Sequence, residues 1–324
     1  MKALVFREFG GPEVLHMSEV ADPVLVAGSI IVRMRAIGLN FADIYRRRGN
    51  YHLAGQAPWI LGYEGAGIVE QVGEGVEGIR VGDRVGFADA PHANAELVAV
   101  SADRVIPLPP DISFEQAASV LLQGLTAHYL VNDSYPVRAG EEVLVHAAAG
   151  GVGQLLIQLC KNKGARVLGL TSSDAKRQVA MDAGADETLL YGNDGSWVSK
   201  AQEWSVGRDG LNVAYDSVGS TLLDSFAAVK AKGAVVFYGM AGGDPPPIDP
   251  RMLMDTSSTL TGGDLWNHVT TREERIRRAA SLFADMAERK LKIERPKQFA
   301  LRDGAEAHRY MESRQSTGKI VFIP

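Results

Sequence analysis

The sequence predicts an α/β protein of two domains: an antiparallel β domain and a domain built on a parallel, doubly wound sheet. A chain of 324 residues is too long for one ordinary hydrophobic core and suits two domains. Its first third alternates short strand-like segments with Gly-rich turns, which is typical of antiparallel sheets. From residue 114 onward, strand-like and helix-like segments alternate, and this alternation favours a parallel sheet covered by helices.

The β domain is expected to form a partly closed barrel. β-branched residues are frequent in its strand candidates, residues 4–6, 29–35, 66–72, 83–87 and 96–100. The last segment of the chain, residues 316–324, contains another strand pattern, Lys-Ile-Val-Phe-Ile. We therefore expect this tail to return to the β domain.

The second domain is expected to hold six parallel strands with helices between them. A helix pattern over residues 114–129 follows Ser113, and Gln116 occupies the capping-box position. The strand candidates are residues 142–146, 166–171, 188–191, 211–216, 234–239 and 259–262. The helix candidates between them are residues 153–162, 174–182, 197–204 and 222–229, and residues 270–290 form a further long helix pattern.

Composition excludes several classes of protein. The net charge of −5 argues against nucleic-acid binding, which needs a basic face, and the arginine run at residues 46–48 is interpreted as solvated. The single cysteine, Cys160, excludes an intrachain disulfide and is expected to be inert core. No apolar run reaches about 18 residues, so no membrane span is expected. The N-terminus lacks a signal-peptide pattern, and a cytoplasmic location is expected.

The sharpest local signal is the segment Ala148-x-Gly150-x-x-Gly153, which follows an apolar strand and opens a helix. This is a variant of the dinucleotide-binding fingerprint, with alanine at the first glycine position. Gly150 would let the backbone approach a pyrophosphate, and Gly153 would let the helix pack on the strand. Gly151 and Val152 begin that helix, whose free N–H groups would face the phosphates. The sequence therefore predicts a Rossmann-type nucleotide site.

The choice between NAD and NADP depends on the end of the second strand of that domain, where an acidic residue would bind the ribose hydroxyls. Here the strand ends in Ser172 and Ser173, and Lys176 follows within reach of a 2′-phosphate. Asp174 comes two or three residues late and is interpreted as the cap or first-turn acid of the next helix. We therefore predict NADPH as the cofactor.

Eight segments along nearly the whole chain together resemble one known family. They are residues 10–15 (GGPEVL), 36–45 (AIGLNFADIY), 61–69 (LGYEGAGIV), 81–85 (VGDRV), 123–127 (QGLTA), 146–153 (HAAAGGVG), 215–219 (YDSVG) and 312–314 (ESR). In this order they resemble the quinone oxidoreductase (zeta-crystallin-like) branch of the medium-chain dehydrogenases/reductases. The resemblance implies a GroES-like, partly open β-barrel domain and an inserted Rossmann domain with a parallel six-stranded sheet. The implied boundaries are 1–122 and 263–324 for the GroES-like catalytic domain and 123–262 for the Rossmann domain.

The resemblance also assigns the cofactor contacts, in the cleft that the family forms between its domains. Residues matching the nicotinamide end are Asn40, Phe41, Asp43, Tyr45, Thr126 and Tyr129. Lys176, Tyr191 and Arg314 would surround the 2′-phosphate. Ser217, Tyr238, Gly239, Met240 and Ala241 would line the rest of the site.

Zinc-dependent members of the superfamily have Gly-His-Glu where this chain has Gly62-Tyr63-Glu64, and a cysteine near residues 40–43. Both ligands are missing, and catalytic zinc needs about three protein ligands, so no metal is expected. Alcohol oxidation is then a poor candidate, because no Lewis acid would stabilise an alkoxide. The segment at residues 262–266 also departs from close relatives, and its role stays open.

Among the candidate catalytic residues, Asn40 could hold the nicotinamide ribose or be a turn asparagine. Tyr45 and Tyr51 could stack on a quinone or donate a hydrogen bond to it, or be surface aromatic residues. Asp43 is interpreted as structural, and His146 as core rather than catalytic.

The resulting prediction is a zinc-independent NADPH:quinone oxidoreductase that acts on small unsaturated carbonyl compounds. An enone or enoyl-thioester reductase on the same scaffold remains an alternative. A second alternative is a non-enzymatic NADPH-binding protein, crystallin-like or RNA-binding. A homodimer is expected through the sixth strand of the parallel sheet, residues 257–262, because an apolar edge strand invites pairing with another chain.

Overall fold

The protein was analysed as a computed structural model that describes residues 1–192 and 195–324. The chain forms two compact units. Unit 1 comprises Met1–Leu125, Val269–Ala287 and Ile293–Pro324, and unit 2 comprises Thr126–His268 and Glu288–Lys292. The first division therefore falls inside a helix, α2 (Phe114–Tyr129), three residues beyond the predicted boundary.

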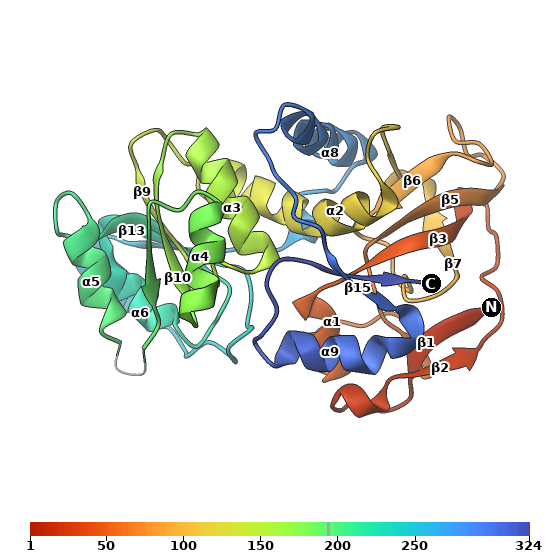
Figure 1. Cartoon of the computed structure of the whole chain (residues 1–324), viewed down its shortest axis with the longest axis horizontal. Helices are drawn as coiled ribbons and strands as arrows, with labels where there is room; N and C mark the ends of the chain where they lie inside the picture. Colours follow the sequence, from red (N-terminus) through yellow and green to blue (C-terminus); the bar gives the residue numbers. More distant parts are fainter. Residues whose placement is uncertain (193–194) are drawn as a thin grey trace. The chain divides into compact units, whose positions relative to one another are not determined.

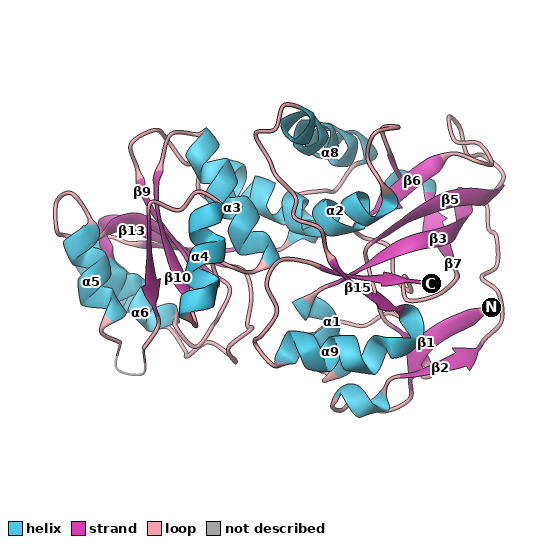
Figure 2. Cartoon of the chain, in the orientation of Figure 1, coloured by secondary structure: helices cyan, strands magenta, loops and turns pink. Residues whose placement is uncertain are grey.

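Unit 1 contains most of the strands (Figures 1 and 2). Its strands are β1 (Lys2–Phe6), β2 (His16–Glu19), β3 (Ser29–Leu39), β4 (Trp59–Ile60), β5 (Gly65–Val72), β6 (Arg84–Phe87), β7 (Leu97–Ser101), β8 (Ile106–Pro107), β15 (Lys297–Ala300) and β16 (Ile320–Ile323). Its helices are α1 (Phe41–Arg47), most of α2, α8 (Arg272–Ala287) and α9 (Gly304–Glu312), with short 3-10 turns at Pro12–Val14, Ala102–Arg104 and Leu301–Asp303.

The large sheet of unit 1 has the order β15-β16-β3-β5-β6-β8, and β7 also pairs with β3. β3 is 11 residues long, and irregularities between Ile31 and Val32 and between Met34 and Ala36 interrupt its pairing with β5. Such bulges bend a strand, so one strand can serve two sides of an open barrel. The tail strand β16 pairs antiparallel with β3, which confirms that the tail returns to this domain.

Unit 2 holds a parallel sheet with helices around it (Figure 2). The strands are β9 (Glu142–Val145), β10 (Arg166–Thr171), β11 (Glu187–Leu190), β12 (Leu211–Asp216), β13 (Val229–Phe237) and β14 (Thr259–Gly262). The helices are α3 (Gly151–Asn162), α4 (Asp174–Asp182), α5 (Trp197–Trp204), α6 (Leu222–Ala228) and α7 (Pro250–Thr256), with a π-helical turn at Leu130–Ser134 and a 3-10 turn at Leu265–Asn267.

The parallel sheet has the order β11-β10-β9-β12-β13-β14. In order along the chain this is 3-2-1-4-5-6, the doubly wound arrangement that binds dinucleotides where the strand order reverses. The reversal lies between β9 and β12, which are neighbours in the sheet. The predicted fold class, a GroES-like β domain with a six-stranded Rossmann domain, is confirmed.

Cys160 is fully buried on α3, and burial raises the pKa of its thiol to about 12. The thiol is therefore protonated near neutral pH and unreactive, as predicted. In the part of the chain that the structure describes, none of the helices combines the length and hydropathy that crossing a bilayer requires.

Candidate active site

The predicted dinucleotide loop lies where β9 ends and α3 begins. Ala147 has a left-handed backbone, with φ of 47°, and Gly150 is the N-cap of α3. A Cβ at Gly153 would lie only 2.5 Å from the carbonyl oxygen of Ala147, so glycine is needed for the helix to pack on the loop. The first-turn N–H groups of α3 have no acceptor within the helix. These residues fit the pyrophosphate of a dinucleotide.

The segment after β10 has the features predicted for a 2′-phosphate site. Ser172 is exposed, and Lys176 lies in the first turn of α4. Asp174 is the first residue of that helix, its side chain is 83% exposed, and its Oδ1 lies 3.5 Å from Nη1 of Arg177. This confirms Asp174 as a first-turn acid. The strand end itself thus carries hydroxyls and a lysine instead of an acid for ribose hydroxyls.

Two other predicted cofactor segments contact each other. The turn at Ser217 follows β12, and residues 238–241 follow β13. The Ala241 N–H donates to the Ser217 carbonyl at 3.0 Å, and the Gly242 N–H donates to the Val218 carbonyl at 2.8 Å. The carboxyl ends of neighbouring strands therefore form one continuous border beside the glycine loop.

Thr126 and Tyr129 lie at the end of α2 and are buried, with 9% and 1% of their surfaces exposed. The His268 ring stacks on the Tyr129 ring, with 4.2 Å between centroids and 7° between planes. A Cβ at Gly263 would lie 2.8 Å from the Tyr129 hydroxyl oxygen. The segment at residues 262–266 therefore packs against Tyr129 and needs its small residue there.

Tyr191 and Arg314 belong to different units. Tyr191 follows β11, and its hydroxyl oxygen accepts a hydrogen bond from the Ala147 N–H at 2.8 Å, so Tyr191 contacts the glycine loop directly. Arg314 follows α9 in unit 1, is exposed, and has a left-handed backbone with φ of 59°. Its role at the 2′-phosphate stays a prediction.

In unit 1, Asn40 is the N-cap of α1, and its side chain is saturated with hydrogen bonds. Nδ2 donates to Glu64 Oε2 at 2.9 Å and to the Gly38 carbonyl at 3.4 Å. Oδ1 accepts from Lys319 Nζ at 2.8 Å and from Gln123 Nε2 at 3.3 Å. These four bonds use the whole capacity of a primary amide. In this conformation the amide orders unit 1 and has no remaining donor for a ligand.

A buried ion pair holds that amide. Glu64 Oε2 lies 2.6 Å from Lys319 Nζ, and 0% and 4% of the two side chains are exposed. Glu64 Oε1 accepts the N–H of Leu122, in the middle of α2, at 2.7 Å. A Cβ at Gly38 would lie 2.1 Å from Glu64 Oε2, so only glycine leaves room for this carboxylate. Through these contacts Glu64, the residue before β5, is linked to α2 and to Lys319, the residue before β16.

Tyr45 and Tyr51, the predicted substrate tyrosines, are partly exposed neighbours. Their ring centroids are 6.4 Å apart in an edge-to-face arrangement of 76°. The Arg46 guanidinium lies 5.0 Å from the Tyr51 ring and 3.7 Å from the Tyr63 ring, and Arg46 Nε donates to the His52 carbonyl at 3.0 Å. A buried arginine therefore fixes the loop that carries Tyr51.

The interpretation of the arginine run as solvated is wrong for two of its three members. Arg46 is 1% exposed and Arg47 is 0% exposed, whereas Arg48 is exposed. Arg47 lies 2.7 Å from Glu312 and 2.9 Å from His308 Nδ1. Both partners belong to α9, more than 260 residues along the chain, so tertiary pairing compensates the buried charge.

Asp43 and Phe41 occupy the first turn of α1. Asp43 is 1% exposed, and its Oδ2 accepts the N–H of Asn40 at 3.0 Å. Burial raises the pKa of Asp43, against the opposing effect of Arg46. Phe41 lies on the same helix with its ring centroid 6.4 Å from that of Tyr45. These contacts support a structural role for Asp43.

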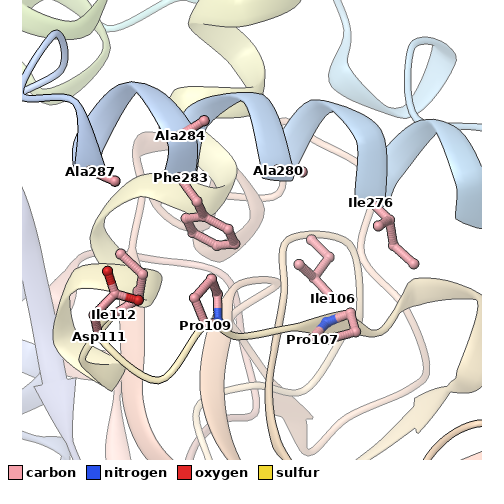
Figure 3. Close-up of a pocket in the computed structure, with 10 residues that line it drawn as sticks. All are labelled: Ile106, Pro107, Pro109, Asp111, Ile112, Ile276, Ala280, Phe283, Ala284 and Ala287. Carbon is pink, nitrogen blue, oxygen red and sulfur yellow. The ribbon is translucent and has the colours of Figure 1, made fainter.

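A separate apolar pocket of about 330 Å³ lies in unit 1 between α8 and residues 106–112 (Figure 3). Asp111 is the one charged residue among those that line it. None of the predicted site residues lines this pocket, and we assign it no chemistry.

Two family profiles match the chain. Residues 26–110 match the alcohol dehydrogenase GroES-like domain, and residues 151–285 match the zinc-binding dehydrogenase profile. The quinone oxidoreductase of Pseudomonas aeruginosa is 38% identical over 326 residues, which cover 100% of this chain and 99% of that protein. The chain belongs to the quinone oxidoreductase family.

Two further family members bear on cofactor and acceptor. The quinone oxidoreductase of Escherichia coli, solved in complex with NADPH, superposes with a TM-score of 0.96 at 36% identity and covers 100% of both chains. The 2-haloacrylate reductase of Burkholderia sp is 34% identical over 332 residues, which cover 99% of this chain and 98% of that protein.

The zinc in the profile's description does not fit the side chains of this family member. Tyr63 stands at the histidine position, its hydroxyl accepts the Ala54 N–H at 3.2 Å, and the Arg46 cation covers its ring. The adjacent Glu64 is paired with the Lys319 ammonium. Within residues 1–192 and 195–324, no cluster of three or more His, Cys, Asp or Glu side chains could hold a metal ion.

Sequence reasoning missed Glu64, Gln123 and Lys319. Glu64 was visible only as the neighbour of a missing zinc ligand, and Lys319 only as part of a strand pattern. A lysine at the start of an apolar strand was the available signal, because a buried lysine requires an acidic partner.

Proposed function

We propose that the protein is an NADPH-dependent reductase that transfers hydride to quinones or related small unsaturated carbonyl compounds. The carboxyl edge of the six-stranded sheet carries this proposal. There the glycine loop after β9 adjoins the serine and lysine after β10, its neighbour in the sheet. The full-length relatives named quinone oxidoreductase support the choice of acceptor.

The residues of unit 2 would hold the cofactor. The first turn of α3, with Gly150 to Gly153, would bind the pyrophosphate. Ser172 and Lys176 would bind the 2′-phosphate, because an ammonium forms a charge-assisted hydrogen bond with a phosphate oxygen. When bound, NADPH supplies a hydride to the acceptor.

Tyr45 and Tyr51 would position the acceptor in unit 1. Their edge-to-face rings offer an apolar surface for a planar molecule, and each hydroxyl can donate a hydrogen bond to a carbonyl oxygen. A quinone that receives a hydride and a proton becomes a hydroquinone. Its conjugated system spreads the developing negative charge, so the reaction needs no Lewis acid to stabilise a localised alkoxide.

Steady-state rates with a panel of quinones and a matched panel of enones test the acceptor class. We expect a higher kcat/KM for quinones. The 2-haloacrylate reductase among the relatives makes activated alkenes the informative rivals. A consistently higher kcat/KM for enones would reject the quinone assignment and favour the alkene reductase.

Four finer points stay predictions: a homodimer formed through β14, activity without zinc, a cytoplasmic location and the absence of nucleic-acid binding. β14 is the last strand of the six-stranded sheet, which supports edge-to-edge pairing. A salt titration tests the RNA-binding alternative, because real phosphate contacts give a steep dependence of affinity on salt.

A further inference from the structure

Five polar side chains of unit 2, three of them fully buried, form a cluster at the point where the strand order of the sheet reverses. His146 follows β9, and Asp216 ends β12, its neighbour in the sheet. Ser225 comes from α6, and Tyr191 and Thr221 complete the cluster. His146, Asp216 and Ser225 are all 0% exposed. The proposed chemistry uses none of these three.

Asp216 is the acceptor at one end of the cluster. Its Oδ1 accepts the N–H groups of Val218 at 2.8 Å and Gly219 at 3.0 Å. Its Oδ2 accepts the hydroxyls of Thr221 at 2.8 Å and Ser225 at 2.7 Å. Burial would raise the pKa of Asp216, but the hydrogen bonds from Ser225, Gly219 and Val218 contribute to a pKa below its ordinary value. Asp216 is therefore an ionised acceptor, and both hydroxyl protons point at it.

This assignment fixes the protonation of His146. Because the Ser225 hydroxyl proton is used by Asp216, its oxygen can only accept from His146 Nε2, which lies 3.0 Å away. Burial lowers the pKa of His146, so the ring is neutral at pH 7. A neutral ring with hydrogen on Nε2 has Nδ1 as an acceptor, and the Tyr191 hydroxyl lies 3.3 Å from that atom.

Tyr191 connects this series of hydrogen bonds to the glycine loop. Its oxygen accepts the Ala147 N–H at 2.8 Å. Because Nδ1 of a ring with hydrogen on Nε2 can only accept, the Tyr191 hydroxyl is the donor in its 3.3 Å contact with that atom. The hydrogen bonds then run in one direction from the Ala147 N–H through Tyr191, His146 and Ser225 to the Asp216 carboxylate. A backbone N–H can only donate and a carboxylate can only accept. Both ends of the chain are therefore fixed, and so is its direction.

The two ends of this hydrogen-bond chain, Ala147 and Asp216, lie at the two loops that the proposed function assigns to the cofactor. Ala147 opens the glycine loop in a left-handed conformation, which is unfavourable for a residue with a side chain. Asp216 folds the turn that contains Ser217. We propose that His146, Ser225 and Asp216 are positioning residues that lock these loops in one arrangement and thereby set the affinity for NADPH. This inference rests on the proposed function.

Replacing the Asp216 carboxylate with an amide tests the direction of the hydrogen-bond chain. In Asp216→Asn, the amide oxygen must face the Val218 and Gly219 N–H groups, so its NH₂ group must face Thr221 and Ser225. The Ser225 hydroxyl then turns its proton away from residue 216, toward His146 Nε2 or toward the Thr221 carbonyl oxygen at 3.1 Å. A proton that turns toward Nε2 requires the ring to carry its hydrogen on Nδ1. Nitrogen-15 NMR, with the His146 signals assigned by their loss in His146→Gln, should show Nε2–H in the wild type and, where the proton turns toward Nε2, Nδ1–H in Asp216→Asn. A wild-type ring with Nδ1–H would overturn the inference.

NADPH binding tests the consequence for affinity. His146→Leu removes the donor and the acceptor at similar volume and should raise the Kd and KM for NADPH about tenfold, as expected for unsatisfied buried partners. At saturating NADPH its kcat should stay within about twofold of wild type. His146→Gln can donate and accept, so it should restore most of the affinity.

Ser205→Ala is the matched control, because Ser205 is a buried serine of the same unit with hydroxyl contacts outside this cluster. It should leave the Kd unchanged. Equal NADPH affinity in wild type and His146→Leu, or no rescue by glutamine, contradicts the positioning role while the proposed function stands. A wild type that binds no NADPH refutes both.

Discussion

Replacing Glu64 with glutamine tests the core of unit 1. The substitution keeps the shape of the side chain but removes the charge that faces Lys319 Nζ at 2.6 Å. Lys319 is 4% exposed, so its ammonium would stay out of water and would face neutral oxygens, such as Asn40 Oδ1 at 2.8 Å. The helical N–H of Leu122 would also compete for the remaining amide oxygen.

The expected cost follows from the burial of both charges. Removing one partner of a buried ion pair costs about 3–5 kcal/mol, because the other charge is left uncompensated. A loss of that size is a large share of a total stability of about 5–15 kcal/mol. The double variant Glu64→Gln/Lys319→Met contains neither charge, and we expect it to recover at least about 2 kcal/mol relative to Glu64→Gln.

Urea unfolding of the wild type, both single variants and the double variant measures this coupling. Independent sites add within about 0.3–0.5 kcal/mol. Additive losses would therefore refute the reasoning that the two charges stabilise each other. Arg33→Gln is the matched control, because it breaks an ion pair with Glu70 whose side chains are 48% and 35% exposed, and exposed pairs contribute only about 0–1 kcal/mol.

Three further predictions follow from named side chains. Burial, together with Arg47, lowers the pKa of His308 to about 3, whereas the pKa of an unfolded histidine is near 6.5. As the pH falls below 6.5, the unfolded state therefore binds a proton at this histidine that the folded state does not bind. The stability that is present above pH 6.5 is lost progressively as the pH falls. Relative to His308→Gln, wild-type stability measured by urea unfolding should drop by about 2–3 kcal/mol from pH 7 to pH 4.5, and a pH-independent difference would contradict this. Leu260→Pro in the edge strand β14 should weaken the predicted dimer in light scattering, whereas Leu190→Pro in β11, at the opposite edge, should not; a monomeric wild type or equal effects would reject that interface. Activity should survive a chelator, and one zinc per chain lost together with activity would overturn the zinc-independent mechanism.

Local patterns predicted the features whose causes are local. The capping box at the start of α2 is present, because the Ser113 N–H donates to Gln116 Oε1 at 2.9 Å and the Gln116 N–H donates to Ser113 Oγ at 3.1 Å. Asp174 is the acid in the first turn of its helix, beside Arg177, and Gly153 is required by a close approach to the preceding turn. In each case the partners lie within a few residues, so their spacing carries the information.

Long-range pairing explains what the sequence could not predict. Glu64 and Lys319 are 255 residues apart, and Arg47 and Glu312 are 265 residues apart. Spacing along the chain says nothing about such partners, so an arginine run resembles a solvated face until the fold brings a carboxylate to it. The short helix α1 was missed for a related reason, since long-range pairs such as Arg47 with Glu312 hold its few residues, and tertiary contacts stabilise so short a helix more than propensity does.

The preference for NADPH tests the central claim most directly. Wild-type protein should reduce a quinone with a much higher kcat/KM for NADPH than for NADH. Lys176→Ala should lower the NADPH value by about 10- to 150-fold, the loss of one charge-assisted contact, with little change for NADH. The exposed Lys200→Ala on α5 should change neither value. Equal use of both cofactors by the wild type, or an NADPH preference that survives Lys176→Ala, would contradict the account.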